Sequence, residues 1–310
     1  MSTKTQRPPR SGTRRSRREV LAGAVAGIGG LAGCTSILAR ETEGPVSILV
    51  AGSLANAAEN GLRPALDRPV RVEAQGSAHG ARLVASGERD PDIVSLADTV
   101  LFSTPMSAGW YAAFATNAVV LAYDPGTPGG ERIERVAPDR WYDPLQAGDV
   151  RLGRTDPDLD PLGYRTLFVL ELAGDRYGGV DELRTAIPRR EQLYPETRLA
   201  SAFETGEIEA AFCYRSTAVD RGYAFVSLPP AIDLSDPAFE EAYAEVTYTL
   251  PSGTTVRGAP IVYGATARSD GSAVREVFRR HVRGAYLPEF GFTPPERGAR
   301  VVGDGPGWLR

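Results

Sequence analysis

Short apolar runs alternate with helix-length segments along the first part of the chain. Three such runs, each bounded by turn-forming residues, predict strands at 47–51, 70–73 and 92–96. Two helices, at 54–62 and 79–85, are expected to connect these strands. Strands that alternate with helices of this length predict a parallel sheet covered on both faces.

The run at 118–122 ends in the turn signal Asp124-Pro125-Gly126, and we interpret the segment from Ala113 to Tyr123 as the crossover into a second domain. Residues 124–149 show no clear period and are expected to be irregular. Further apolar runs predict strands at 150–153, 210–214, 223–228 and 259–267. Helices are expected at 161–173, 197–205 and 273–286. The pattern therefore predicts two α/β domains.

The first 33 residues have the pattern of an export signal. Seven basic residues precede an uncharged stretch, Val20 to Ala32, which is shorter than the ~20 residues of a membrane-spanning helix. Residues 16–21 (SRREVL) resemble a twin-arginine signal. Residues 31–34 (LAGC) resemble a lipobox whose Cys34 accepts lipid, and residues 34–45 then form a tether. We therefore expect an exported protein anchored to the outer face of the cell membrane.

Removal of the signal makes the chain acidic. The signal holds seven of the 35 basic residues but one of the 39 acidic residues, which leaves a formal charge near −10. The only lysine, Lys4, lies in the signal, so the remaining cations are arginines. This balance argues against nucleic-acid binding, and it means that an anion site must rely on local donors.

The sequence lacks the patterns of several kinds of chemistry. Two histidines, His79 and His281, and Cys213 do not make a usual zinc site. The glycine patterns of nucleophile elbows, phosphate loops and dinucleotide sites do not occur. Cys213 has no disulfide partner once Cys34 is lipidated, and we interpret it as a buried small hydrophobic residue. Neither an enzyme nor a resident cofactor is expected.

Several predicted strands end in small or hydroxyl residues where a helix starts. Gly52-Ser53 follows the first strand, Gly76-Ser77 follows the second, and Asp160-Pro161 opens the helix predicted at 161–173. The N-terminus of a helix presents free backbone N–H groups that suit anions, and ligand sites in open α/β sheets lie at the carboxyl ends of strands. Each serine alone is better explained as a helix cap, but the set indicates an anion site.

Three segments together resemble the archaeal-type tungstate/molybdate-binding proteins of ABC importers. They are 51–54 (AGSL) with Gly76-Ser77, then 154–165 (RTDPDLDPLGYR), and 212–218 (FCYRSTA) continuing to 228–237 (LPPAIDLSDP). The similarity extends from about residue 46 to Pro295. It implies a type II periplasmic-binding-protein-like fold, in which two α/β lobes joined by crossover strands enclose a ligand cleft. We expect residues 46–118 and 261–310 to form the first lobe and 119–260 the second.

The resemblance also implies ligand contacts. Ser53 and Ser77 donate hydrogen bonds to the oxyanion from the first lobe, and Tyr214 donates from the second. Asp160 matches a carboxylate that approaches the metal itself in this family, although an aspartate before proline at a helix start is more often a cap. A second carboxylate of the family is replaced here by Ser227, which favours tetrahedral over six-fold coordination.

Arginines are not required at such a site. Arg82, Arg165 and Arg215 are free to pair with carboxylates, because neutral donors bind an oxyanion without desolvating a guanidinium. Asp233 lies near Ser227 in the sequence, but nothing in the sequence indicates that it replaces the missing carboxylate.

We therefore expect a monomeric, membrane-anchored binding protein that captures tungstate or molybdate and delivers it to an ABC-transporter permease. The sequence does not choose between the two oxyanions. One alternative is a binding protein for another small anion such as sulfate or phosphate, which a competition titration separates. The other is an exported α/β hydrolase, which turnover of an ester substrate would reveal.

Overall fold

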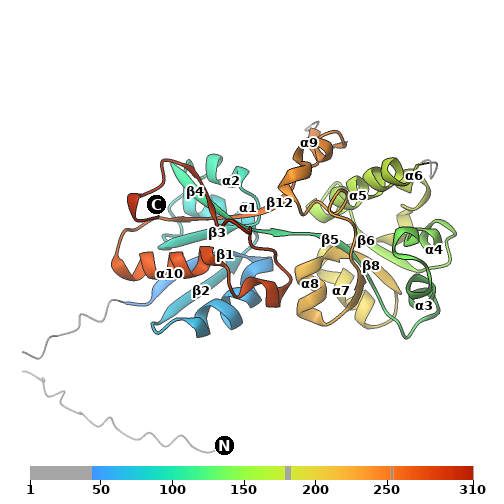
Figure 1. Ribbon diagram of the computed structural model, residues 1–310, viewed down its shortest axis with the longest axis horizontal. Helices are drawn as coiled ribbons and strands as arrows, with labels where there is room; N and C mark the ends of the chain where they lie inside the picture. The colour runs from blue at the N-terminus through green and yellow to red at the C-terminus, as the bar shows by residue number, and fades with distance from the viewer. Residues whose placement is uncertain (1–43, 179–182, 252, 254, 310) are drawn as a thin grey trace, which may run out of the picture. The chain divides into compact units, whose positions relative to one another are not determined.

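The computed structural model (Figure 1) describes residues 44–178, 183–251, 253 and 255–309. The predicted signal of residues 1–33, the predicted lipidation site Cys34 and nearly all of the predicted tether lie outside the described residues. Residues 43–310 form one compact unit. None of the helices in the described ranges is both long enough and apolar enough to cross a membrane.

The first lobe is built on a six-stranded sheet in the order β13-β4-β12-β3-β1-β2. Its strands are β1 (Val46–Ala51), β2 (Val70–Gln75), β3 (Ile93–Leu96), β4 (Trp110–Asn117), β12 (Ile261–Ala267) and β13 (Arg300–Gly303). β1 pairs in parallel with β2 and β3, whereas β12 is antiparallel to β3 and β4, and β13 to β4. The parallel arrangement predicted for the first three strands is therefore confirmed for β1, β2 and β3, and the antiparallel pairs arise from β4, β12 and β13. β4 leads towards the second lobe and β12 returns from it, so these two strands run in opposite directions.

The second lobe has a five-stranded sheet in the order β7-β6-β8-β5-β9. Its strands are β5 (Val119–Tyr123), β6 (Leu152–Thr155), β7 (Leu193–Tyr194), β8 (Ala210–Tyr214) and β9 (Ala224–Val226). β6 is parallel to β7 and β8, whereas β5 is antiparallel to β8 and β9. β5 is the exception because it enters from the first lobe.

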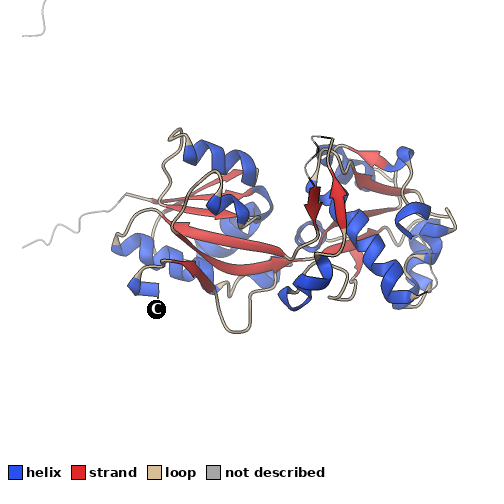
Figure 2. Ribbon diagram, turned by 90° about the horizontal axis from the view of Figure 1, so that it is seen from above, coloured by secondary structure: helices blue, strands red, loops and turns tan. Residues whose placement is uncertain are grey.

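Only Ala118 separates β4 from β5, so the chain crosses between the two sheets almost without a loop (Figure 2). The return crossing ends at Ile261, where β12 begins. Between β9 and β12 the chain forms a hairpin of β10 (Thr247–Thr249) and β11 (Thr255–Arg257), which the sequence did not reveal. The fold is thus two-lobed and α/β, while the bounds of each lobe as an independent unit stay a prediction.

Both faces of the first sheet are buried, as the apolar runs predict. Leu49 of β1 belongs to a cluster with Ala81 and Val84 of α1 (Ser77–Ala85). Its neighbour Ile48 belongs to the main core, which includes Phe278 of α10 (Ser272–Arg283). Successive side chains of a strand point to opposite faces, so a continuous apolar run requires a helix on each side.

The second sheet follows the same rule. Phe212 of β8 shares a core with Phe168 of α5 (Pro161–Tyr177), whereas Cys213 packs with Leu199 and Phe203 of α7 (Glu196–Glu204). Cys213 is buried and free, which confirms its interpretation as a small hydrophobic residue. The carboxyl end of β8 is therefore held rigidly between two helical layers.

Residues 124–149 are not irregular, contrary to the expectation. They contain α3 (Pro128–Arg135) and α4 (Asp143–Gln146). Thr127 caps α3, because its side chain accepts a hydrogen bond from Gly130 N, and Pro128 occupies the first helical position. The segment was misjudged because Gly129 and Gly130 interrupt the apolar period of so short a helix.

The remaining helices are short. The helix predicted from residue 54 is a 3₁₀ turn, η1 (Gly52–Leu54), followed by a π-helical turn, η2 (Ala57–Leu62). The others are α2 (Val100–Ser103), α6 (Leu183–Ala186), α8 (Arg215–Arg221) and α9 (Glu240–Tyr243). A further 3₁₀ turn, η7 (Leu287–Phe290), precedes the C-terminal strand β13.

Candidate functional site

Two predicted site residues follow neighbouring strand ends in the first lobe. Ala51 of β1 stands opposite Gln75 of β2 in the parallel register, so Ser53 and Ser77 each lie two residues beyond a paired position. The Ser53 side chain is exposed, and its Oγ lies 2.9 Å from Tyr263 Oη. The structure thus places Ser53 and Ser77 on the same edge of the sheet.

Ser77 is the first residue of α1. Its Oγ accepts a hydrogen bond from Ala97 N at 3.0 Å, and Ala97 directly follows β3. Because the hydroxyl oxygen is the acceptor in this bond, its proton remains available to a ligand. Ser77 therefore joins the ends of two strands and keeps one donor.

In the second lobe the corresponding edge is formed by the carboxyl ends of the parallel strands β6 and β8. Tyr214 is the last residue of β8, and its phenol oxygen accepts a hydrogen bond from Arg165 Nη1 at 2.6 Å. Burial raises the pKa of Tyr214 to about 12, so the phenol stays protonated at neutral pH. Since the oxygen accepts from Arg165, the Tyr214 O–H is free to donate in another direction.

Asp160 caps the long helix α5. Its Oδ1 accepts a hydrogen bond from Leu162 N at 2.7 Å, and Pro161 takes the first helical position. Its other oxygen, Oδ2, is buried and forms no hydrogen bond of normal geometry among the described residues, and the same holds for the nearby Thr155 Oγ1. Burial raises the pKa of the Asp160 carboxyl, an effect that the Leu162 N–H, the Arg165 charge and the Thr155 hydroxyl oppose. Asp160 thus has one oxygen engaged as a cap and a second oxygen close to the Thr155 hydroxyl.

Arg165 does not form the pair with a carboxylate that the sequence allowed. In the described part of the chain it forms no ion pair, and its guanidinium lies 5.7 Å from the Tyr214 ring centroid. It follows Asp160 by five positions on a helix, about 140° around the axis. Sequence spacing therefore gave no sign that the Arg165 charge acts on the Asp160 carboxyl.

Arg215 does not pair with a carboxylate either. Its Nε donates to Gly291 O at 2.8 Å, and its Nη2 donates to Thr293 Oγ1. These bonds attach the start of α8 to the segment that follows η7. Arg215 therefore has a structural role in holding these two segments together, whereas the described hydrogen bond of Arg165 is to the Tyr214 hydroxyl.

A buried polar network connects the two lobes at the crossover. Asn117 Nδ2 donates to Ser216 Oγ at 2.8 Å and lies 3.3 Å from Tyr263 Oη, while its Oδ1 accepts from Ala118 N at 2.9 Å. Tyr263 in turn contacts Ser53. The network links the first-lobe donor Ser53 to α8 of the second lobe, and no local sequence signal pointed to it.

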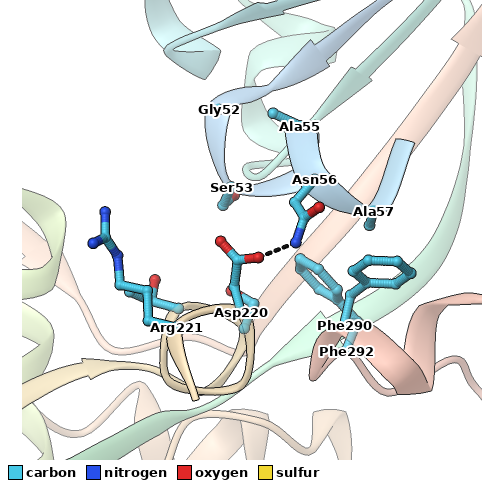
Figure 3. A pocket seen from close by; sticks show the side chains of 11 residues that line it. Gly52, Ser53, Ala55, Asn56, Ala57, Asp220, Arg221, Phe290 and Phe292 are labelled. Carbon is cyan, nitrogen blue, oxygen red and sulfur yellow. Dashed lines mark hydrogen bonds between the residues drawn. The ribbon is translucent and has the colours of Figure 1, made fainter. Parts of the chain in front are cut away.

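Cavities border these residues from two sides. One, of about 240 Å³, lies between Ser53 and Asn56 of the first lobe and Ser216, Asp220 and Arg221 of α8 (Figure 3). Asn56 Nδ2 donates a hydrogen bond to Asp220 Oδ1 across this cavity.

The second cavity is larger. It measures about 980 Å³ and is bordered by Arg165 and Tyr164 of α5 and by Ala97, Asp98 and Thr99 at the end of β3. Four arginines line this cavity: Arg165, which is half-buried, and the exposed Arg257, Arg297 and Arg300. Such an arrangement suits an anion, because each of these groups offers a hydrogen to a negatively charged oxygen. Ser53, Asp160 and Tyr214 border other, separate pockets.

The other candidates lie apart from this arrangement. Ser227 is exposed and makes no hydrogen bond among the described residues. Asp233 is buried, and its Oδ1 accepts from Ser235 N at 2.8 Å. His79 is exposed on α1, whereas His281 is buried with Nε2 2.8 Å from Ser95 Oγ. Within the described ranges no group of histidine, cysteine and acidic residues has the arrangement of a metal site.

Comparison with known proteins identifies relatives along most of the chain. A protein of Haloferax volcanii, provisionally named an ABC transporter molybdenum-binding protein, is 49% identical over 307 residues, which cover 96% of this chain and 98% of that protein. The molybdate/tungstate-binding protein WtpA of Thermococcus kodakarensis is 32% identical over 225 residues, 64% of this chain and 63% of that protein.

Solved structures show the same fold. The periplasmic molybdate-binding protein of Azotobacter vinelandii superimposes with a TM-score of 0.50 at 14% identity, covering 81% of this chain and all of that chain. The substrate-binding domain of a Clostridium difficile molybdenum ABC transporter gives a TM-score of 0.53 at 13% identity, covering 81% of this chain and 99% of its own. A sequence profile described as bacterial extracellular solute-binding protein matches residues 54–281. The chain belongs to this family of extracellular solute-binding proteins.

Proposed function

We propose that the protein binds tungstate or molybdate in the cleft between its lobes and delivers the oxyanion to an ABC-type importer. Within the structure the proposal rests on the Tyr214–Arg165 pair, because Arg165 borders a cavity that residues at the end of β3 also line and both side chains can donate hydrogen bonds to an anion. The identity of the anion is supported by the names of the Haloferax volcanii and Thermococcus kodakarensis relatives. No resident cofactor and no catalysed reaction are part of this proposal.

The donors proposed to hold the oxyanion are Ser53, Ser77 and Tyr214. The hydroxyl of Ser77 and the phenol of Tyr214 each keep a proton after their structural bonds are satisfied. Asp160 is proposed as a direct ligand of the metal through Oδ2, the oxygen that the helix cap does not use. Ser227 leaves the second carboxylate position without a charge, so a six-coordinate centre with two carboxylates does not form. If Asp160 serves only as the helix cap, the oxyanion keeps its four-oxygen, tetrahedral coordination.

Binding is proposed to favour a closed form of the two lobes, which the importer recognises. Two features support this view: the crossover contains a single residue, Ala118, between β4 and β5, and the Asn117 network spans it. A ligand that contacts both lobes stabilises the form in which both sets of donors reach it.

Membership of an extracellular family supports export of the chain. We extend this to a twin-arginine signal in residues 1–33 and to a lipid anchor at Cys34, with the folded part acting as a monomer outside the membrane. The residues behind these proposals are the basic and apolar pattern of 1–33 and the LAGC segment. Mass spectrometry of the membrane fraction, with Cys34→Ser as the comparison, tests the anchor.

A calorimetric titration of the chain from residue 34 onward, with tungstate, molybdate and then sulfate, tests the proposed function. We expect a dissociation constant on the order of 1 nM for tungstate or molybdate, a binding free energy of about −12 kcal/mol, and no measurable sulfate binding. Binding of neither oxyanion by a folded sample contradicts the proposal. Preferential binding of sulfate or phosphate favours the alternative anion.

A further inference from the structure

Arg165 carries a positive charge next to the proposed site and has no acidic partner. Arginine is always ionised in proteins. Its only hydrogen bond in the described part of the chain is the one from Nη1 to Tyr214 Oη, and none of the described carboxylates forms an ion pair with it. Four of the five N–H donors of the Arg165 guanidinium therefore have no hydrogen-bond partner among the described residues.

The remaining donors of Arg165 face open space. Arg165 lines the cavity of about 980 Å³, together with the residues that follow β3 of the first lobe. Arg257, Arg297 and Arg300 also line it, but they are exposed, whereas Arg165 is half-buried beside Tyr214. No nitrogen of Arg165 is both fully buried and without a hydrogen-bond partner. The N–H groups of Arg165 that do not bond to Tyr214 therefore border this cavity rather than the protein interior. An anion that enters the cleft therefore reaches the guanidinium directly.

Three carboxylates are considered as partners, of which Glu240 lines the same cavity but forms no ion pair with Arg165. Asp98 lines the same cavity, and Asp160 lies close enough for the Arg165 charge to lower its pKa against the effect of burial. Neither approaches Arg165 within ion-pair distance. Asp160 directs Oδ1 to Leu162 N instead, and Asp98 Oδ1 accepts from Val100 N at 3.0 Å. The charge of Arg165 is thus left for a species that the protein does not itself supply.

We propose that Arg165 is the counter-charge of the bound oxyanion and sets the preference of the site for dianions over monoanions. This rests on the proposed function and deepens it. A charge-assisted bond from Arg165 gains more from an oxygen that shares two negative charges than from one that shares a single charge. Through its bond to Tyr214 Oη, Arg165 also turns the Tyr214 proton away from itself and towards the cleft.

A comparison of tungstate with perrhenate distinguishes the effect of ligand charge from the effect of ligand shape. Both are tetrahedral four-oxygen anions of closely similar size, but tungstate carries two negative charges and perrhenate carries one. Neutral donors fit both anions in the same geometry, and they too bind the dianion more strongly. A counter-charge therefore shows itself as a loss of the preference for tungstate when the charge is removed.

The experiment measures the affinities of both anions by calorimetry for the wild type, Arg165→Met and Arg165→Lys. The matched control is Arg176→Met, which removes an exposed charge from the other end of the same helix. We expect Arg165→Met to weaken tungstate binding by about 100-fold and perrhenate binding by less than about fivefold. Arg165→Lys keeps the charge and is expected to retain most of the preference, and Arg176→Met is expected to change neither affinity.

Each other outcome contradicts the proposal. Equal loss of both anions in Arg165→Met means that Arg165 only positions Tyr214. Loss of the preference in Arg165→Lys as well as in Arg165→Met means that charge is not the cause, and this variant decides the question should Arg165→Met fail to fold. Absence of tungstate and molybdate binding by the folded wild type contradicts the proposed function and this inference together.

Discussion

Ser77 Oγ accepts a hydrogen bond from the backbone N–H of Ala97 at 3.0 Å, so the residue that begins α1 also fixes the end of β3. The same hydroxyl is proposed to donate its proton to the oxyanion. One side chain would thus couple the ends of two strands to ligand binding, because Ser77 follows β2 and its hydroxyl holds the residue after β3.

Replacement of Ser77 by alanine is expected to reduce both binding and stability. Tungstate affinity should fall ten- to a hundredfold, about 1.5–3 kcal/mol, because the ligand is charged and loses a donor. The free energy of unfolding should fall by about 1 kcal/mol, because Ala97 N loses its acceptor. Calorimetry and urea denaturation measure the two effects. Ser86→Ala, at the exposed end of the same helix, is the control, and wild-type affinity in Ser77→Ala would refute the assignment.

Removal of the Tyr214 hydroxyl isolates the second-lobe donor. Tyr214→Phe is expected to weaken tungstate binding by about 1.5–3 kcal/mol, since the phenol O–H is lost while the ring packing remains. Tyr223→Phe is the matched control, because the Tyr223 phenol bonds to Glu204 Oε1 at 2.7 Å, on the exposed side of the lobe. Equal affinities for both variants in calorimetry would remove Tyr214 from the site.

The substitution Asp160→Asn distinguishes the role of Asp160 as a helix cap from its proposed role as a metal ligand. Asparagine caps helices about as well as aspartate, so the stability of Asp160→Asn should stay within about 0.5 kcal/mol of the wild type. If Oδ2 ligates the metal, tungstate affinity falls by about tenfold or more, and we expect this result because the helix cap uses only Oδ1 and Oδ2 forms no hydrogen bond of normal geometry among the described residues. Unchanged or tighter binding in calorimetry would show that Asp160 serves only as the cap of α5.

Local patterns predicted the buried elements well. The strand predicted at 210–214 is β8 (Ala210–Tyr214), because a fully buried run bounded by polar turns has few other interpretations. Exposed or short elements such as α3 and the β10–β11 hairpin were missed, since their apolar period is brief. Ser53, Ser77 and Asp160 were selected partly because parallel strands bring their carboxyl ends to one edge, whereas Tyr214 was selected through the family resemblance alone.

The other partners of the site have no local signature. Tyr263 meets Asn117 and Ser53 only because β12 returns to the first sheet from the second lobe, 146 residues after Asn117. Arg165 reaches Tyr214 across 49 residues, from a helix to a neighbouring strand end. Such pairs depend on how two elements pack, and a single sequence does not specify that packing residue by residue.

Asp233 lies beside the crossover, and its carboxyl is buried and has a raised pKa. Its side chain is 6% exposed, and its backbone oxygen accepts from Val119 N, the first residue of β5, at 2.9 Å. Burial raises the pKa of the Asp233 carboxyl from 3.8 to about 6, although the Ser235 N–H and the Arg215 charge oppose the shift. The folded protein therefore binds the proton more tightly than the unfolded chain does.

The sign of the pH dependence follows from that difference. Between about pH 4 and pH 6 the folded state holds more protons than the unfolded state, so stability falls as pH rises, by up to about 3 kcal/mol. Asp233→Asn keeps an acceptor for Ser235 N and cannot ionise. We expect it to raise the free energy of unfolding at pH 7.5 by about 1–3 kcal/mol and to change it little at pH 4. Urea denaturation at both pH values measures this, with the exposed Asp175→Asn as control. An equal effect at the two pH values would show that Asp233 does not titrate in this range, because only ionisation makes the substitution depend on pH.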